Sequence, residues 1–319
     1  MCAGSGGPSS PEGTASLLDR RHLLTAAAAT AAALGGVSSF AAPAAADDDH
    51  GPRKRRVPRD QISIQLYTLR DQLAADFEGT IAALADIGYR RVEHAGFVGR
   101  TVQEFKSVTD ANGIRVSSGH TQIPQPFNEA AWNASLQDAL TLGSKYIVHP
   151  FFGINFGTGE IARDTATWKA FAVDLNRAGR MARAAGLRLG YHNHNWEFFT
   201  LTDNPRMTAY DVLIGHTDPR YVHFEMDLFW VTRGARDPVD LLHRLRSRVM
   251  QYHVKDMNQS GSFEDPGKGL IDFPRIFRSG HSVNEYIVER DDAGTPPRSP
   301  ADALETARVG FDYLAGVRF

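Results

Sequence analysis

The sequence predicts an α/β protein whose main part is a single (β/α)8 barrel, and three observations lead to this prediction. From residue 61 onward, short β-rich runs alternate with longer amphipathic runs. Eight such pairs fit into roughly 260 residues, the usual size of this barrel. The main alternative is an open doubly wound sheet, which usually has a glycine-rich phosphate loop after its first strand. Here that strand is followed by Thr68-Leu69-Arg70-Asp71, so the barrel is favoured.

The expected elements follow each other in regular order. Helices are expected where apolar residues recur at helical spacing, and strands where short apolar runs lie between turn residues. Asn128 is a plausible N-cap, and Gly88 and Gly143 are plausible helix stops. The expected strands are 62–69, 91–93, 114–120, 145–149, 187–194, 221–228, 249–256 and 286–290, and the expected helices are 77–87, 102–111, 128–142, 165–185, 205–214, 238–246, 273–278 and 301–314.

The first sixty residues are expected to lie outside the barrel. Asp19-Arg20-Arg21-His22-Leu23-Leu24-Thr25 is a twin-arginine pattern, an alanine-rich apolar run follows, and Ala44-Ala45-Ala46 offers a small-residue cleavage site. We therefore predict a twin-arginine signal peptide over 1–46, a solvated linker over 47–60 and the barrel over 61–319. The apolar run is too short for a comfortable membrane span. The mature protein is thus expected to be secreted or extracytoplasmic, without stable membrane insertion.

Composition excludes some classes of partner. The 319 residues include 35 Lys and Arg against 37 Asp and Glu, a net charge of −2, with 42% hydrophobic residues. This near-neutral balance opposes a nucleic-acid partner, which normally requires a basic surface. Cys2 is the only cysteine, so the sequence contains neither a disulfide framework nor a cysteine metal site.

Polar residues gather where the predicted strands end. Catalytic groups of a (β/α)8 barrel come from the C-terminal ends of several strands. Buried polar side chains need partners, so six histidines, one Asp and two Glu at such ends are better explained by one shared polar site than by separate buried contacts. The residues at these ends are Gln65, Tyr67, Glu93, His94, His120, His149, His192, His194, Asp227, His253, Lys255 and Glu289.

Four of these residues form a candidate metal site. His192, Asp227, His253 and Glu289 come from four successive predicted strands and could hold one divalent cation. Mixed nitrogen and carboxylate ligands suit manganese, zinc, cobalt or iron(II) better than calcium. Glu225 lies two residues before Asp227 and therefore faces the same side, one layer deeper. We expect it either to orient a ligand histidine or to form a buried ion pair.

From residue 61 to its C-terminus, the chain resembles the sugar phosphate isomerase/epimerase family, the xylose isomerase-like TIM barrels. The motifs fall in the family's order and together are specific for the superfamily, although each alone is weak. They are Ile64-Gln65-Leu66-Tyr67-Thr68-Leu69-Arg70, Gly88-Tyr89-Arg90-Arg91-Val92-Glu93, Tyr191-His192-Asn193-His194-Asn195-Trp196-Glu197-Phe198, Met226-Asp227-Leu228-Phe229-Trp230, His253-Val254-Lys255-Asp256, Gly267-Lys268-Gly269-Leu270-Ile271-Asp272 and Ile287-Val288-Glu289.

The resemblance also implies a ligand set. In the family's ketose epimerases, Glu, Asp, His and Glu from strands five to eight hold the metal, and the two glutamates move the proton. Asp227, His253 and Glu289 match the last three ligands. His192 stands in place of the first glutamate, with His194 or Glu197 as substitutes if the register differs. An epimerase that uses two carboxylate bases therefore does not follow directly from the resemblance.

The function implied by the resemblance is a metal-dependent isomerase or epimerase that acts on a non-phosphorylated keto-sugar through an enediolate. Glu289 would abstract the proton next to the carbonyl, and His194 or Glu197 would return it. The closest alternative is a metal-dependent lyase or hydratase of 3-keto-sugars or keto-glycosides, with a histidine as general acid. Two further alternatives are weaker. Charge and export oppose an AP-endonuclease-like hydrolase, and a non-catalytic sugar-binding barrel would not need four ligand-type residues.

Substrate contacts are expected from further strand-end residues. Lys255 could contact a substrate oxygen or be solvated, and Trp230 or Trp196 could stack on a sugar ring or simply pack. The Phe- and Gly-rich loop 151–159 could be a lid or a subunit contact, which leaves a homo-oligomer open beside the small carbohydrate as a partner. The expected contact residues are Lys255, Trp230, His120, His149, Glu93 and Tyr67.

Overall fold

Within the residues described by the computed structural model, 55–280 and 283–319, eight parallel strands form a closed ring. Six of them form one sheet in the order β1-β12-β9-β8-β7-β4, and β2 pairs with β3. Two parallel bridges, Gln65 to Glu93 and His120 to Val148, join the pair to the sheet on both sides. The strands are β1 (Ile62–Ile64), β2 (Arg91–His94), β3 (Arg115–Gly119), β4 (Tyr146–His149), β7 (Arg188–His192), β8 (Val222–Asp227), β9 (Val249–Val254) and β12 (Glu285–Val288).

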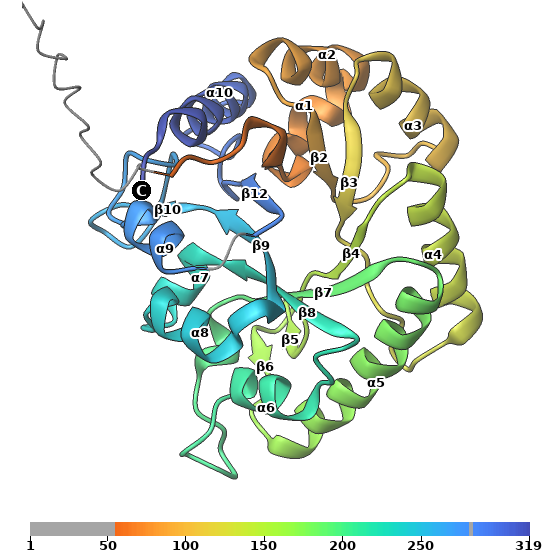
Figure 1. Cartoon of the computed structure of the whole chain (residues 1–319), viewed down its shortest axis with the longest axis vertical. Coiled ribbons are helices and arrows are strands. Elements are labelled where there is room, and N and C mark those ends of the chain that lie inside the picture. The colour runs from red at the N-terminus through yellow and green to blue at the C-terminus, as the bar shows by residue number, and fades with distance from the viewer. Residues whose placement is uncertain (1–54, 281–282) are drawn as a thin grey trace, which may run out of the picture. The chain divides into compact units, whose positions relative to one another are not determined.

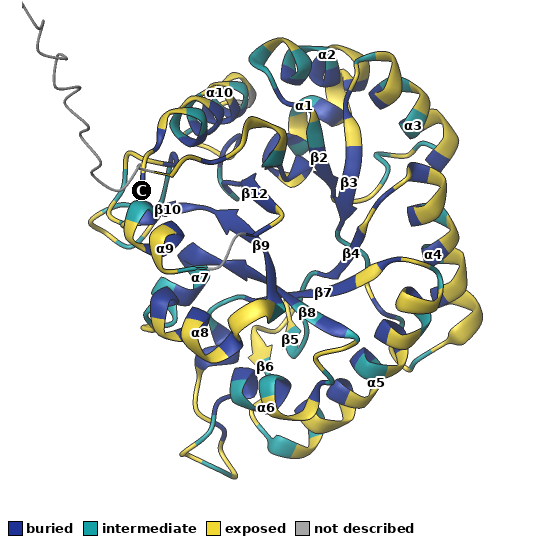
Figure 2. Ribbon diagram, in the orientation of Figure 1, coloured by how far each residue is buried: buried dark blue, intermediate teal, exposed yellow. Residues whose placement is uncertain are grey.

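The helices lie outside this ring (Figure 1). Each has a buried stripe that faces the strands, and Figure 2 shows the exposed residues on their outer sides. In the longest helix the buried stripe includes Trp168, Phe171 and Leu175, which recur every three or four residues. The helices are α1 (Arg70–Ala75), α2 (Phe77–Ile87), α3 (Val102–Ala111), α4 (Glu129–Leu142), α5 (Thr165–Ala184), α6 (Ala209–His216), α7 (Leu228–Arg233), α8 (Pro238–Leu245), α9 (Phe273–Ser279) and α10 (Pro300–Gly316).

The first strand is shorter than predicted. It ends at Ile64, and a 3-10 helix (Leu66–Leu69), followed directly by α1, replaces the second half of the predicted strand 62–69. The side-chain oxygen of Gln65 accepts a hydrogen bond from the Tyr67 N–H at 3.1 Å, which caps the turn. A side chain that caps its own following backbone competes with strand pairing. This local bond explains why the chain turns here.

Two small hairpins and one helix were not predicted. The predicted loop 151–159 contains β5 (Ile154–Asn155), which forms a small antiparallel hairpin with β6 (Glu160–Ile161). After β9, β10 (Asp256–Met257) pairs with β11 (Phe263–Glu264). Helix α7 follows β8 directly, because the Asp227 carboxylate accepts the Trp230 N–H at 2.8 Å and caps the helix. All three lie beyond C-terminal ends of barrel strands.

The predicted signal peptide, 1–46, and most of the predicted linker lie outside the described residues. The last linker residues are attached to the barrel: Arg56 pairs antiparallel with Arg318, and Val57 is buried. In the described ranges, every helix is too short or too polar to cross a membrane.

Asn128 provides a test of the predicted capping. Its side-chain oxygen accepts the Ala131 N–H at 2.9 Å at the start of α4, as predicted. We expect Asn128→Ala to lower the free energy of unfolding by about 1 kcal/mol, measured by urea denaturation. Asn133→Ala is the matched control, since it makes the same change at an exposed position inside the same helix. Equal stability of the two variants would contradict the capping assignment.

Candidate active site

The four predicted ligands converge at the C-terminal ends of β7, β8, β9 and β12. Strand register places Asp227 beside His253, while His192 ends β7 and Glu289 follows β12. One ligand atom from each residue lies within 4.8 Å of the other three, and all four side chains are buried. His253 Nδ1 is 2.6 Å from Glu289 Oε2, and His192 Nε2 is 3.6 Å from Asp227 Oδ2. We call these four residues the ligand quartet.

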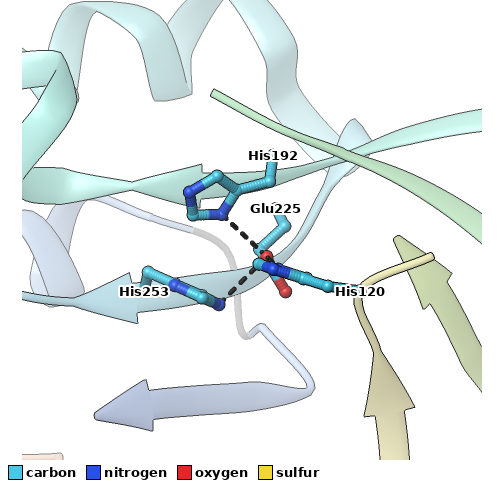
Figure 3. Close-up of side chains that lie close together, drawn as sticks. All are labelled: His120, His192, Glu225 and His253. Atoms are coloured by element: carbon cyan, nitrogen blue, oxygen red, sulfur yellow. Dashed lines mark hydrogen bonds and ion pairs between the residues drawn. The ribbon is translucent and has the colours of Figure 1, made fainter. Parts of the chain in front are cut away.

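Glu225 lies directly beneath the ligand quartet and holds its two imidazoles. Its Oε2 is 2.9 Å from His120 Nε2, 2.9 Å from His192 Nδ1 and 3.0 Å from His253 Nε2. Figure 3 shows the three rings directed at this carboxylate. A carboxylate only accepts, so each ring donates an N–H here. His192 Nε2 and His253 Nδ1 therefore remain for the ligand quartet, as expected for an orienting carboxylate below metal-binding histidines.

A second carboxylate, Glu93, lies in the same deeper layer. Its Oε1 accepts a hydrogen bond from Gln65 Nε2 at 2.8 Å and lies 2.8 Å from His253 Nε2, while its Oε2 accepts from the Ser118 hydroxyl at 2.5 Å. Burial, together with the nearby charge of Glu225, raises the pKa of Glu93 to about 7. The prediction that Glu93 contacts the substrate is not supported, because the side chain is fully buried beneath the histidines.

The protonation and the donor atoms of the ligand quartet suit the binding of a metal cation. Burial alone would lower the pKa of His253, but the carboxylates of Glu225 and Glu289 raise it well above its usual range. The ring therefore carries a proton at the place where a metal would bind, and metal binding releases such a proton. Asp227 Oδ2 is buried without a hydrogen bond of good geometry. Two imidazoles and two carboxylates match the donors preferred by manganese, iron, cobalt or zinc.

Lys255 is a buried cation beside the ligand quartet. Its side chain is 2% exposed, which rules out a solvated lysine. The ammonium lies 3.0 Å from Asp227 Oδ2, 2.7 Å from Glu289 Oε2 and 2.8 Å from Asp291 Oδ1. Burial opposes its charge, but these carboxylates raise the pKa of Lys255 well above its usual range. The lysine is therefore charged and held by three anions.

A cavity of about 620 Å³ opens above the ligand quartet. The predicted residues Tyr67, His120, His194 and Trp230 line it together with Lys255 and parts of the quartet. Asp291 and Phe156 also line it but were not predicted as site residues. Asp291 follows Glu289 by two residues, so strand alternation could have identified it. Phe156 lies between β5 and β6, in the loop 151–159 that was predicted only as a lid or a subunit contact. The lining residues are Tyr67, Ala95, Gly96, His120, Gln122, Pro150, Phe151, Phe156, His192, His194, Trp196, Trp230, Lys255, Glu289 and Asp291.

Two predicted site residues support the cavity wall without lining it. Glu197 Oε1 accepts the Tyr191 hydroxyl at 2.7 Å and its Oε2 accepts the His194 N–H at 2.9 Å, and burial raises the pKa of Glu197 to about 8. His149 Nδ1 accepts the Ile123 N–H at 2.9 Å, and burial lowers the pKa of His149 to about 3. Both side chains are fully buried. The structure does not support the predictions that Glu197 exchanges a proton with the substrate and that His149 contacts it.

His194 itself faces the cavity. Its ring stacks on Trp196, with centroids 4.2 Å apart, and lies 5.3 Å from the Trp230 ring. Its Nδ1 has no hydrogen-bond partner. Burial, followed by repulsion from His192 and Lys255, lowers the pKa of His194 well below its usual range. The ring is therefore neutral and has a free polar atom.

The family of this chain is shown by a match to a protein-family model that covers most of the barrel. Residues 81–305 match the family described as Xylose isomerase-like TIM barrel. The chain belongs to this family. It is 24% identical over 233 residues to an inosose dehydratase of Clostridium beijerinckii, with 63% of this chain and 76% of that protein covered. An inosose dehydratase of Clostridium botulinum is 24% identical over 269 residues, covering 75% and 88%.

A solved structure agrees with the fold. A sugar phosphate isomerase/epimerase from Parabacteroides distasonis superposes with a TM-score of 0.67 at 25% sequence identity. The superposition covers 81% of this chain and 95% of that protein. The predicted family and the predicted barrel are thereby confirmed. The names of these relatives include both a dehydratase and an isomerase/epimerase, so the family alone leaves two reaction types open.

The role of Glu225 can be measured separately from stability. Glu225→Gln removes the charge that fixes both ligand imidazoles, so we expect affinity for Mn²⁺ or Zn²⁺ to fall by about 10- to 100-fold in calorimetric titrations. Glu285→Gln is the matched control, because Glu285 is equally buried but sits at the start of β12, where it accepts from Arg91 at 3.0 Å. This variant should bind the metal with unchanged affinity. Wild-type affinity in Glu225→Gln would disprove the orienting role.

Proposed function

We propose that the protein is a metal-dependent lyase that eliminates water or an alcohol from a non-phosphorylated keto-sugar or keto-polyol. One observation carries this proposal. Both carboxylates that line the cavity, Glu289 and Asp291, follow β12, whereas His192 ends β7, three strands away in the sheet, and His194 follows it. The site therefore has a carboxylate base on one wall only. The similarity to proteins named inosose dehydratase also supports the proposed elimination.

The ligand quartet would hold one divalent metal. Such a cation supplies a Lewis acid that stabilises negative charge on substrate oxygens. Lys255 adds a fixed positive charge at the cavity wall, 2.7 Å from Glu289 Oε2. Preorganised charges of this kind favour the enolate over the neutral ketone. The identity of the metal stays a prediction among manganese, zinc, cobalt and iron.

The protein side chains complete the elimination. Glu289 takes the proton from the carbon next to the carbonyl, and the C–H electron pair becomes part of the new C=C bond. The C–O bond at the next carbon breaks, and its electron pair leaves with the oxygen. His194 donates its ring N–H as a hydrogen bond to that departing oxygen. The Glu289 carboxyl then gives up the proton to it, so water or an alcohol leaves and Glu289 is restored.

Isomerisation or epimerisation is the second candidate function. It would begin with the same proton abstraction but return the proton to carbon, without loss of a leaving group. The likeness to the Parabacteroides distasonis isomerase/epimerase supports this alternative. It would need a second proton-transfer group, and Glu197, which the sequence offers, lies outside the cavity lining.

The lining argues against a phosphorylated substrate. Lys255 is the only Lys or Arg among the lining residues, and three carboxylates already neutralise it. Phosphate groups are normally bound by arginines or by several free donors. The proposed export through the twin-arginine route would agree with a non-phosphorylated substrate, because sugar phosphates are largely intracellular.

Removal of the metal tests the proposed dependence. We expect treatment with a chelator to abolish two reactions, solvent exchange of the proton next to the carbonyl and elimination. Both are measured by NMR of keto-sugars in D2O. Addition of Mn²⁺, Zn²⁺, Co²⁺ or Fe²⁺ should restore both, since the ligand quartet accepts any of these ions. Full activity in protein shown by elemental analysis to be metal-free would overturn the proposal. Exchange without elimination would favour the isomerase or epimerase instead.

Two variants distinguish the proposed roles of Glu289 and His194. Glu289→Gln should abolish exchange and elimination together, because it removes both the base and a ligand. His194→Phe should slow elimination by about 100-fold while solvent exchange continues, because the base remains. His216→Gln, at an exposed histidine that ends α6, should change neither. Equal losses of exchange and elimination in His194→Phe would disprove the separate role of His194.

A further inference from the structure

The cavity has two chemically different halves. The ligand quartet and Lys255 make one half polar and charged. Phe151, Phe156 and Trp196 line the other part with aromatic rings. The whole volume, about 620 Å³, falls in the range of roughly 300–1,000 Å³ typical of drug-sized ligands. A single sugar bound at the polar half would leave the aromatic rings uncovered.

Phe156 is the least buried of these rings. It is 63% exposed although it packs against two aromatic neighbours. Its ring centroid is 4.9 Å from that of Phe151 and 6.1 Å from that of Trp196, both at 83°. Neither neighbour stacks face to face on it, so most of the ring remains open. An apolar face left in water favours a ligand that covers it.

The hairpin holds Phe156 in place over the cavity. Phe156 follows β5, and the Asn155 side chain accepts the Gly157 N–H at 2.9 Å, while the Asn155 carbonyl accepts the Gly159 N–H at 2.7 Å. At the base of the hairpin, the Ala162 N–H donates to the Gly153 carbonyl at 2.8 Å. The turn is thus fixed by hydrogen bonds at its tip and at its base.

The surface on which Phe156 rests is also fixed. Trp196 donates its indole N–H to the Phe152 carbonyl at 2.9 Å, and its ring stacks on His194 at an interplanar angle of 14°. His194 in turn lies beside His192 of the polar half, with ring centroids 5.0 Å apart. The aromatic rings therefore continue directly from the reacting end, and a ligand group placed there would be joined to the sugar by a short link.

We propose that this aromatic half is a subsite for a second ring, joined to the keto-sugar through a glycosidic oxygen, and that Phe156 determines specificity for that ring. The inference rests on the proposed function for the identity of the first ring. Apolar faces of both aryl groups and sugar rings pack on aromatic side chains, so the subsite accepts either kind of ring. In the elimination proposed above, the second ring would leave with the alcohol.

Binding of inert glycosides tests the subsite without turnover. The probes are methyl β-D-glucoside, phenyl β-D-glucoside and cellobiose, which carry no keto group, titrated calorimetrically into the purified full chain with its metal. We expect phenyl glucoside, cellobiose or both to bind about tenfold more tightly than methyl glucoside, because the second ring covers Phe156. The phenyl and cellobiose titrations distinguish an aryl group from a sugar ring.

The variant Phe156→Ala should reduce this preference to about threefold or less. Leu270→Ala is the matched control, since Leu270 is also 63% exposed and lies outside the cavity lining, and it should keep the preference. Equal affinity of the three probes, binding too weak to detect for all of them, or a preference that survives Phe156→Ala would overturn the subsite. A clear preference in a protein that catalyses no exchange or elimination would reject the proposed function and leave the subsite standing.

Discussion

The site depends on one buried carboxylate that accepts hydrogen bonds from three imidazoles. Glu225 Oε2 lies within 3.0 Å of nitrogens from His120, His192 and His253. A carboxylate without water is tolerated only when donors surround it. Because each ring must present an N–H to Glu225, the opposite nitrogen of His192 and His253 faces Asp227 and Glu289. The geometry of the ligand quartet is therefore set from the layer beneath it.

The need to compensate buried charge also explains the position of Lys255. Asp227, Glu289 and Asp291 bring three carboxylates close together around Lys255, and anions with little water around them repel each other strongly. Lys255 lies within 3.0 Å of all three. Removing one partner of such a buried cluster is costly, because the remaining charges lose their compensation. Lys255 thus favours the ionised form of these carboxylates, and at the same time gives the cavity a positive charge where the proposed enolate would form.

Much of this arrangement could be predicted from sequence, because it follows strand alternation. Asp227 and Glu225, or His253 and Lys255, share a face at a spacing of two residues, and the ends of parallel strands meet at one edge of the barrel. The alternation of strands and helices, Asn128 as a cap and the glycine stops follow from local patterns. These signals need no knowledge of packing partners.

Sequence patterns are less informative where distant packing decides the position of a residue. His149 ends a strand like His192, but Phe171 of α5 and Tyr191 of β7 enclose its ring, and neither contact is visible in the local sequence. Glu197 lies in a 3-10 turn beyond the predicted strand 187–194, so strand alternation does not describe it. Phe156 depends on a four-residue pairing between β5 and β6. Short irregular elements of this kind carry weak patterns, which is why the polar half was predicted better than the aromatic half.

The departure from the epimerase pattern at His192 now has a physical explanation. Where that pattern implies a glutamate, this chain has an imidazole backed by Glu225 at 2.9 Å, so the negative charge is moved one layer away from the cavity. A histidine in this arrangement can still hold a cation through Nε2, but it cannot accept a substrate proton while that nitrogen is a ligand. Among the ligand quartet, only Glu289 then combines a carboxylate with a place in the cavity lining. One carboxylate base facing imidazoles suits removal of a proton and loss of a leaving group better than symmetric proton return.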